Sequence, residues 1–236
     1  MSLKARRTAR LHKIVGLVAG ALLLSWTASG LFFSLYPITE IRGDPWRPTV
    51  DHGDLSEMSI AITAEQVMSR ESAPVRGLEL KSFLDQPVWM VRTDANQKMV
   101  DAMTGEVRSP LSGEDLQALV ARFDDKPDGL GTLTVSYLIN ENPLREYGGP
   151  LPAWVLEYEP RKQRIYIDAV SGEIHTVRTT KWRIFDILWR FHILDVTGED
   201  RIDSWWLKLA AFLGLTMVLS GLVLLIDRVR KGRFLG

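Results

Sequence analysis

Residues 101–107 read Asp-Ala-Met-Thr-Gly-Glu-Val, and residues 168–174 read Asp-Ala-Val-Ser-Gly-Glu-Ile, so one motif occurs twice at a spacing of 67 residues. The segments 87–91 and 152–156 also match each other, with Pro first and Trp third, at a spacing of 65 residues. Self-similarity at a nearly fixed spacing indicates a repeated supersecondary unit, and two copies indicate a pseudo-symmetric pair.

The repeated motif has the chemistry of a tight turn. An aspartate can accept hydrogen bonds from turn amides, and a glycine adopts positive φ without a Cβ clash. We therefore predict structural turns at Asp101 and Gly105 in one copy and at Asp168 and Gly172 in the other. A pair of catalytic carboxylates is the alternative, but active sites are seldom duplicated in identical form.

The residues around the motif predict a helix and strands in each copy. Thr63 and Gln66 have the spacing of a capping box, so a helix is expected to begin at Ala64, and a second helix is expected after Ser112. Segments that alternate between apolar and polar residues follow each helix and predict half-buried strands. The expected fold class is α+β, with each repeat a helix plus an antiparallel meander.

Two uncharged stretches flank the repeats. Residues 14–38 contain 25 consecutive residues without a charge, and residues 209–226 form an apolar run of 18 after the pair Trp205 and Trp206. A helix needs about 20 residues to cross the hydrocarbon layer, and tryptophan favours the interface. We expect two transmembrane helices. A cleaved signal peptide is the alternative for the first, although its apolar run is long for one.

Charge is distributed in three blocks that cancel to a net charge of zero. Five basic residues and no acid precede residue 39, four basic residues lie among the last nine, and residues 39–208 hold 20 basic and 28 acidic residues. Basic flanks stay in the cytoplasm. The prediction is a bacterial inner-membrane protein with both termini cytoplasmic and an acidic periplasmic domain. An acidic folded part argues against binding to nucleic acid.

The expected organisation has eight parts, bounded by the charge blocks, the apolar runs and the repeats. They are a basic cytoplasmic N-terminus (1–13), a first transmembrane helix (14–38), a linker (39–62), the first repeat (63–110), the second repeat (111–180), an amphipathic interfacial helix with its connector (181–204), a second transmembrane helix (205–227) and a basic cytoplasmic tail (228–236).

One segment of the second repeat departs from the regular pattern. Residues 140–152 are rich in proline and glycine, which predicts an exposed loop. This loop is either a surface for a partner or an unselected insertion.

The repeats resemble PepSY domains, and the two spans resemble the PepSY-associated transmembrane helix family. The matches in the spans are Arg10-Leu11-His12-x-x-Val15-Gly16, Thr27-Ala28-Ser29-Gly30 and Ser220-Gly221-Leu222. The resemblance implies two tandem PepSY-like repeats between the spans. Larger members look like haem-b reductases that act on iron–siderophore complexes, whereas the family name derives from peptidase propeptides. This chain has only two spans.

Two of the four histidines are candidate haem ligands. Gly16 and Gly20 follow His12 at i+4 and i+8, so they form either a face for a flat macrocycle or a helix-packing face. His192 lies on the aromatic face of the amphipathic helix, where it is expected to face the bilayer at the outer surface, as a ligand or as a belt residue. His52 and His175 are expected at the surface or packed on strands.

The two candidate ligands lie about one bilayer, roughly 30 Å, apart, so they cannot share one iron. Two haems would require a homodimer. The sequence contains no hydrolase, zinc-protease or nucleotide-binding motif, and no cysteine, so an enzymatic role is not expected beyond a haem-linked one. Two functions remain: a membrane-anchored binding module for an envelope protein in iron–siderophore handling or peptidase control, and a haem-b electron carrier.

Overall fold

The computed structural model describes residues 3–123 and 129–230, and the side chains of residues 3–12, 223–225, 227 and 228 lie outside this description. The chain divides into two compact units. The membrane unit comprises Met1–Ile38 and Ile184–Gly236, and the central unit comprises Thr39–Arg183.

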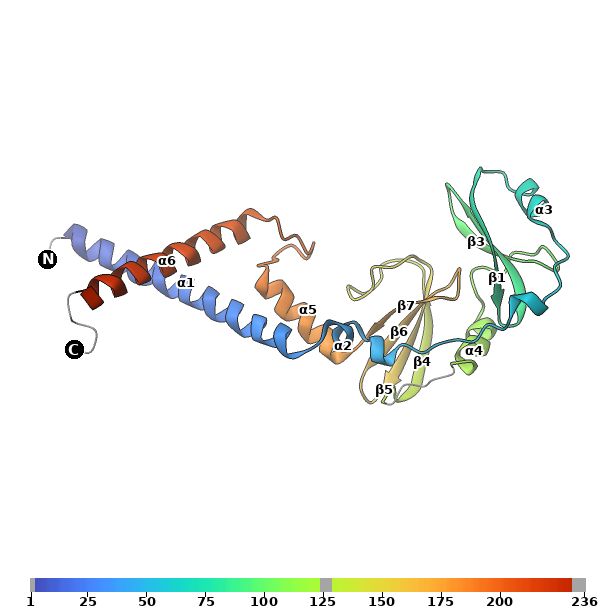
Figure 1. Cartoon of the computed structure of the whole chain (residues 1–236), viewed down its shortest axis with the longest axis horizontal. Helices are drawn as coiled ribbons and strands as arrows, with labels where there is room; N and C mark the ends of the chain where they lie inside the picture. Colours follow the sequence, from blue (N-terminus) through green and yellow to red (C-terminus); the bar gives the residue numbers. More distant parts are fainter. Residues whose placement is uncertain (1–2, 124–128, 231–236) are drawn as a thin grey trace. The chain divides into compact units, whose positions relative to one another are not determined.

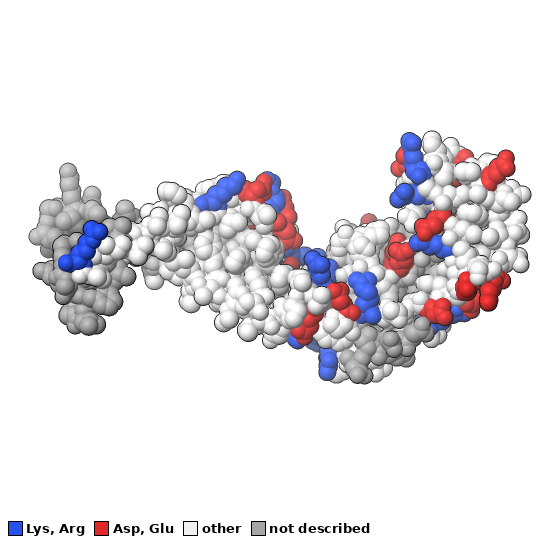
Figure 2. Space-filling view, viewed as in Figure 1, with Lys and Arg blue, Asp and Glu red and all other residues white. Residues whose placement is uncertain are grey.

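Two long helices that lie side by side dominate the membrane unit (Figure 1): α1 (Leu3–Leu35) and α6 (Trp205–Arg230). Their stretches Lys13–Leu35 and Trp205–Leu222 are long and apolar enough to cross a membrane. Only 11% of each stretch is buried inside the protein, so most of its apolar side chains point outward. Figure 2 shows no charged side chain over the middle of these helices. A surface of this kind suits lipid rather than water.

Small residues line the contact between α1 and α6. Ala19 and Ala210 are buried, and a Cβ on Gly16 would lie 3.4 Å from Met217 Cε. A Cβ on Gly214 would lie 3.5 Å from the indole ring of Trp26. Small side chains let two helix backbones approach closely within a membrane, where van der Waals packing rather than the hydrophobic effect drives association.

The first half of the central unit is a helix followed by an antiparallel sheet. The helix α3 (Ala64–Ser69) begins at the predicted capping box, which is present: Thr63 Oγ1 accepts from Gln66 N, and Gln66 Oε1 accepts from Thr63 N. The strands pair in the order β1-β2-β3 and are β1 (Val75–Phe83), β2 (Gln86–Thr93) and β3 (Gln97–Asp101).

The second half repeats this order with one more strand. The helix α4 (Gly113–Ala121) begins after Ser112, whose Oγ accepts from Asp115 N, while Asp115 Oδ2 accepts from Ser112 N. The strands pair in the antiparallel order β4-β5-β6-β7 and are β4 (Thr132–Ile139), β5 (Ala153–Glu159), β6 (Gln163–Asp168) and β7 (Ile174–Arg178).

Four shorter helices lie outside these two sheets. The segment between the first span and the first sheet holds three of them, and a fourth follows the last strand. They are α2 (Ile38–Arg42), η1 (Asp44–Trp46), η2 (Leu55–Glu57) and α5 (Thr180–His192).

Both sheets and α4 contribute to one hydrophobic core. Val88 and Met99 of the first sheet are 1% exposed, and Leu156, Ile165 and Leu119 are fully buried. The chain is therefore α+β, with two antiparallel sheets and two candidate membrane helices. Because the core is shared, the two sheets stabilise each other.

The sequence predicts that the whole segment 140–152 is exposed, but the structure buries part of it. Residues 140–145 are exposed, but Glu146 and Tyr147 are buried at 7% and 3% exposure. The tyrosine ring stacks on Tyr166 of β6 at a centroid distance of 4.7 Å. The loop is anchored at its centre because an aromatic ring and a carboxylate both find partners in the sheet below.

Candidate functional site

The two predicted turns share most of their internal hydrogen bonds. Asp101 Oδ1 accepts from the amide nitrogens of Met103 at 2.7 Å and Thr104 at 2.8 Å. Asp168 Oδ1 accepts from Val170 N at 2.8 Å, and its Oδ2 accepts from Ser171 Oγ at 2.9 Å. These carboxylates hold backbone and hydroxyl groups of their own turns, which is a structural role.

The two glycines of these turns adopt positive φ. Gly105 has φ of 78° and Gly172 has φ of 75°. The amide of each donates to the carbonyl of the turn's aspartate at 2.8 Å. L-residues rarely adopt this conformation, so glycine is required by the backbone.

Each turn is tied to the start of its own strand and its own helix. Ala102 N donates to Pro87 O at 2.9 Å, and Ala169 N donates to Pro152 O at 3.1 Å. Ile62 N donates to Ala102 O at 2.8 Å in the first half. In the second half, the corresponding bond runs from Leu111 N to Ala169 O at 2.7 Å.

The two repeated tryptophans make the same bond as well. Trp89 Nε1 donates to Ile62 O at 2.8 Å, and Trp154 Nε1 donates to Leu111 O at 3.0 Å. Each acceptor directly precedes the residue that caps α3 or α4. The sequence shows the repeated tryptophans, but it does not identify this acceptor, because the two segments are 27 and 43 residues apart.

A buried carboxylate joins several elements of the second half. Glu146 Oε1 accepts from Arg164 Nη1 and from Tyr166 OH, both at 2.8 Å, and its Oε2 accepts from Arg183 Nε at 2.8 Å. Its backbone carbonyl accepts from Arg178 Nε at 2.6 Å. Glu146 therefore connects the loop to β6, β7 and α5.

These partners set the protonation of Glu146. Burial acts to raise the pKa of the carboxyl, but hydrogen bonds from Arg183, Arg164 and Tyr166 outweigh it and leave the pKa below its ordinary value. Burial, with the nearby Glu146 charge and hydrogen bond, raises the pKa of Tyr166. The cluster thus consists of an ionised glutamate, two arginines and a neutral tyrosine.

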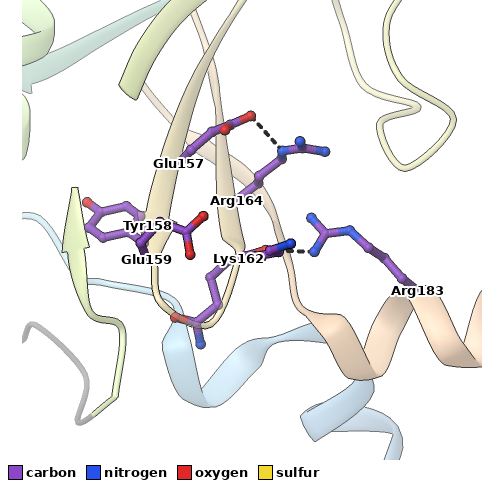
Figure 3. A pocket seen from close by; sticks show the side chains of 7 residues that line it. Glu157, Tyr158, Glu159, Lys162, Arg164 and Arg183 are labelled. Carbon is purple, nitrogen blue, oxygen red and sulfur yellow. Dashed lines mark hydrogen bonds and ion pairs between the residues drawn. The ribbon is translucent and has the colours of Figure 1, made fainter. Parts of the chain in front are cut away.

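A pocket of about 340 Å³ lies beside this cluster, at the β5–β6 hairpin (Figure 3). Arg164 Nε donates to Glu157 Oε1 at 2.8 Å, and Arg183 Nη1 donates to the carbonyl of Lys162 at 2.6 Å. Figure 3 shows both guanidinium groups engaged in this way. The pocket contains paired charges without a nucleophile beside a base, so it has the character of a structural ion-pair network.

Two histidines lie in the central unit. The ring of His52 stacks on Phe83 at 5.4 Å, and its Nδ1 is buried with no hydrogen-bond partner among the described residues. Burial, with the nearby charge of Arg122, lowers the pKa of His52. His175 lies on β7, with its ring edge-on to Tyr147 at 5.4 Å.

His192 lies at the end of α5, packed against α1. The sequence predicts that it faces the bilayer, but Ser29 Oγ lies 2.7 Å from its Nδ1, and Trp26 Nε1 donates to its backbone carbonyl at 2.7 Å. The rings of Phe33 and Trp189 lie 5.5 Å and 6.2 Å from its own. The aromatic face of α5 is used for packing on the first span.

The hydrogen bonds of Ser29 favour one tautomer of His192. Ser29 Oγ donates to Ser25 O at 2.7 Å, and a hydroxyl has only one proton to give. When that proton goes to Ser25 O, Nδ1–H of His192 donates to Ser29 Oγ, and Nε2 has the lone pair with which the ring would ligate a metal.

The other candidate haem residues lie on α1. The side chain of His12 lies outside the described residues. Gly16 faces Met217 of α6, whereas a Cβ on Gly20 would meet no atom within 4 Å. Gly16 thus lies at the helix contact, and Gly20 borders open space.

No group of three or more His, Asp or Glu side chains that could hold a metal ion occurs among the described residues. Residues 9–236 match the PepSY-associated TM region. Comparisons with curated proteins and with solved structures found no match. The match covers nearly the whole chain and includes both membrane helices, so this protein belongs to the family defined by the PepSY-associated TM region.

Proposed function

We propose that the chain is a membrane-anchored binding module in which two copies of one PepSY-like unit present edge strands to a protein partner. The duplicated hydrogen bonds of the turns and tryptophans support the view that the two halves are copies. The observation that carries the function is the state of the sheet edges. In the described part of the chain, no strand pairs with the outer edge of β1 or of β4.

The opposite edges of both sheets are covered. Met99 of β3 accepts a hydrogen bond from Arg108 N and its own amide donates to Ser109 Oγ. At β7, the guanidinium of Arg47 donates to the carbonyls of Ile174 and His175. The open strands β1 and β4 occupy the same place in their sheets, and an open edge can add an extended peptide as a further strand.

The proposed location is the bacterial inner membrane, with both termini cytoplasmic and the central unit periplasmic. The basic residues that flank both spans and the acidic central segment support this orientation. The family resemblance supports an envelope partner in iron–siderophore handling or peptidase control.

Site-specific photocrosslinking in cells would test the binding function. A photoreactive residue replaces either Val135, which is 48% exposed on β4, or Glu79 on β1. The matched control replaces Gln117, on the exposed face of α4. We expect a protein adduct at an edge position and none at Gln117. Edge-strand binding would be rejected if neither edge position gave an adduct, or if all three positions gave adducts in equal amounts. The identity of the crosslinked protein would assign the module to iron handling or to proteolysis.

A haem-b electron-transfer subunit is the second candidate function, favoured by the hydrogen bond between Ser29 Oγ and His192 Nδ1. Ligating histidines usually have their second ring nitrogen held by a hydrogen bond, as Ser29 holds Nδ1 here. Bound haem would supply one-electron transfer across the bilayer. Nε2 of His192 would hold one iron and His12 another, because the 17 residues from His12 to Ser29 span about 25 Å of helix. A homodimer would then complete each site.

The visible spectrum of the protein tests this second function. The full chain is expressed with haem supplementation and purified in mild detergent, together with His12→Ala, His192→Ala and, as a control, His175→Ala. The haem function expects a Soret band that weakens in the first two variants and persists in the control. A protein without a Soret band, or a band that all three variants retain, would exclude it.

A further inference from the structure

The side of α5 turned away from α1 carries an apolar stripe. Ile184, Ile187 and Phe191 are 44%, 53% and 63% exposed, and they follow one another at helical spacing. They lie about 130° around the helix from the aromatic residues that pack on α1. The apolar surface of the helix is therefore wider than the single aromatic face that the sequence suggests.

This stripe lies on a helix whose C-terminal end packs against the first span. The end of α5 lies against Ser29, six residues before the end of α1 at Leu35, which is about 9 Å along the helix. One leaflet of hydrocarbon is about 15 Å thick. With the edge of the hydrocarbon layer placed at Leu35, where the apolar stretch of the first span ends, the last turns of α5 lie at the depth of acyl chains.

The stripe continues into a groove that has one charged wall. Ile187, Phe191, Leu194 and Val196 line a groove of about 350 Å³ together with Arg190 and Asp195. Val196 is 77% exposed. An apolar groove with a guanidinium at its side fits a molecule with a long apolar chain and an anionic head.

The charge of Arg190 is incompletely matched within the protein. Its Nε is buried with no hydrogen-bond partner among the described residues, and its nearest carboxylate, Asp195 Oδ2, is 3.8 Å away. That carboxylate already accepts hydrogen bonds from Thr197, Gly198 and Asp200. The Arg190 side chain is 40% exposed, so a second anion in the groove would gain a charge-assisted hydrogen bond from the exposed end of the guanidinium rather than from the buried Nε.

We propose that this groove binds an anionic phospholipid of the bilayer, with an acyl chain along Ile187 and Phe191 and the phosphate at Arg190. The site anchors α5 inside one leaflet, so the protein has a third membrane-embedded helix beside its two spans. Lipid binding in this groove does not depend on the partner that the edge strands bind.

Fluorescence quenching in nanodiscs tests the lipid site with the full chain. The protein has no cysteine, so Ile187→Cys or Phe191→Cys introduces a single site for bimane, and Ile202→Cys, in the loop before α6, is the control position. Acyl-chain nitroxides on phosphatidylglycerol and on phosphatidylcholine serve as quenchers. Both are expected to quench bimane at residues 187 and 191 more strongly than at residue 202.

The contact between the lipid phosphate and Arg190 is tested by comparing the two lipids. Quenching by phosphatidylglycerol is expected at about tenfold lower lipid fraction than quenching by phosphatidylcholine, because one charge-assisted hydrogen bond strengthens binding by about that factor. Arg190→Gln should remove this preference and Arg190→Lys should retain part of it. Arg201→Gln, at an exposed arginine paired with Asp203, should leave it unchanged.

Three results would overturn the proposal. The absence of quenching by either lipid at residues 187 and 191 would exclude an acyl chain in the groove. Dipolar broadening between spin labels at these residues would then show that a second copy of the chain occupies the groove. Equal quenching by the two lipids would exclude an anionic headgroup site. A preference that survives Arg190→Gln would exclude Arg190 as the phosphate contact.

Discussion

Ser29 and His192 are 163 residues apart in the sequence, yet they share one short hydrogen bond. Ser29 also donates to the helix carbonyl four residues earlier, as hydroxyl groups in membrane spans commonly do. Its hydroxyl therefore contacts both a backbone carbonyl of α1 and the histidine ring of α5. A single residue connects the backbone of the span to the end of α5.

Ser29→Ala should change the tautomer of His192. Without its acceptor, the Nδ1–H form loses its advantage, so a mixture of both neutral tautomers is expected. Nitrogen-15 chemical shifts of labelled imidazole in detergent measure the two forms, with Ser34→Ala near the end of α1 as the control. The cost in stability should be small, about 0.6 kcal/mol. An Nε2–H tautomer in the unmodified protein would contradict the assignment.

Glu146→Gln should destabilise the central unit by about 1–3 kcal/mol at neutral pH, because the partly buried Arg183 loses its carboxylate partner and Arg164 keeps only Glu157. The pKa of Glu146 is lowered by folding. Its stabilising contribution is therefore present above the pKa of the unfolded chain and is lost as pH falls through the folded pKa. Urea unfolding of the full chain at pH 7 and at pH 4 measures both effects.

The matched control for this substitution is Glu141→Gln, in the exposed part of the same loop. It should leave the unfolding midpoint nearly unchanged. The difference in stability between the Glu146 variant and the unmodified chain should shrink on acidification. A difference that stays constant from pH 7 to pH 4 would mean that the carboxylate charge is not what stabilises the loop.

At the scale of elements, the two turns share most of their internal hydrogen bonds but differ in the side chains that pack around them. A Cβ on Gly172 would lie 2.5 Å from Phe83 Cε2 and 3.3 Å from Leu111 Cδ1, which are core atoms. At Gly105 the nearest atoms belong to the guanidinium of Arg70, the flexible end of an exposed side chain. Only the second turn is packed into the shared core.

Gly172→Ala should therefore destabilise the protein more than Gly105→Ala. Both substitutions place alanine at positive φ, which costs about 1–2 kcal/mol. The second turn adds overpacking of the core, worth about 1–3 kcal/mol. Urea unfolding of the two variants provides the comparison, and equal losses would indicate that the core beside Gly172 yields without strain.

Local features of this fold are readable from the sequence, because they depend on residues close together in the chain. The capping box at Thr63 and the glycine of each turn are of this kind. The partners of Glu146 and His192 are not, because they are set by how distant segments pack. The periodicity of α5 shows its aromatic face, but nothing local indicates that this face meets a helix rather than lipid.

At the scale of the whole molecule, the proposed topology can be tested with the same cysteine-free chain. Glu141→Cys in the central unit should react with a membrane-impermeant maleimide in cells whose inner membrane is intact. Gly236→Cys at the C-terminus should react only after that membrane is permeabilised. Immunoblotting of a mass-tagged adduct measures both, and the reverse pattern would invert the orientation.

The shared core of the two sheets has a consequence for how the central unit breaks down. Leu119 of α4 belongs to a hydrophobic cluster that contains residues of both sheets, so separating the halves would open this cluster to water. A protease that cuts between β3 and α4 would yield no durable fragment, because separation exposes the apolar surface of each half. The central unit should therefore be degraded or retained as one piece, and a recombinant gene that carries only one half should give an insoluble product.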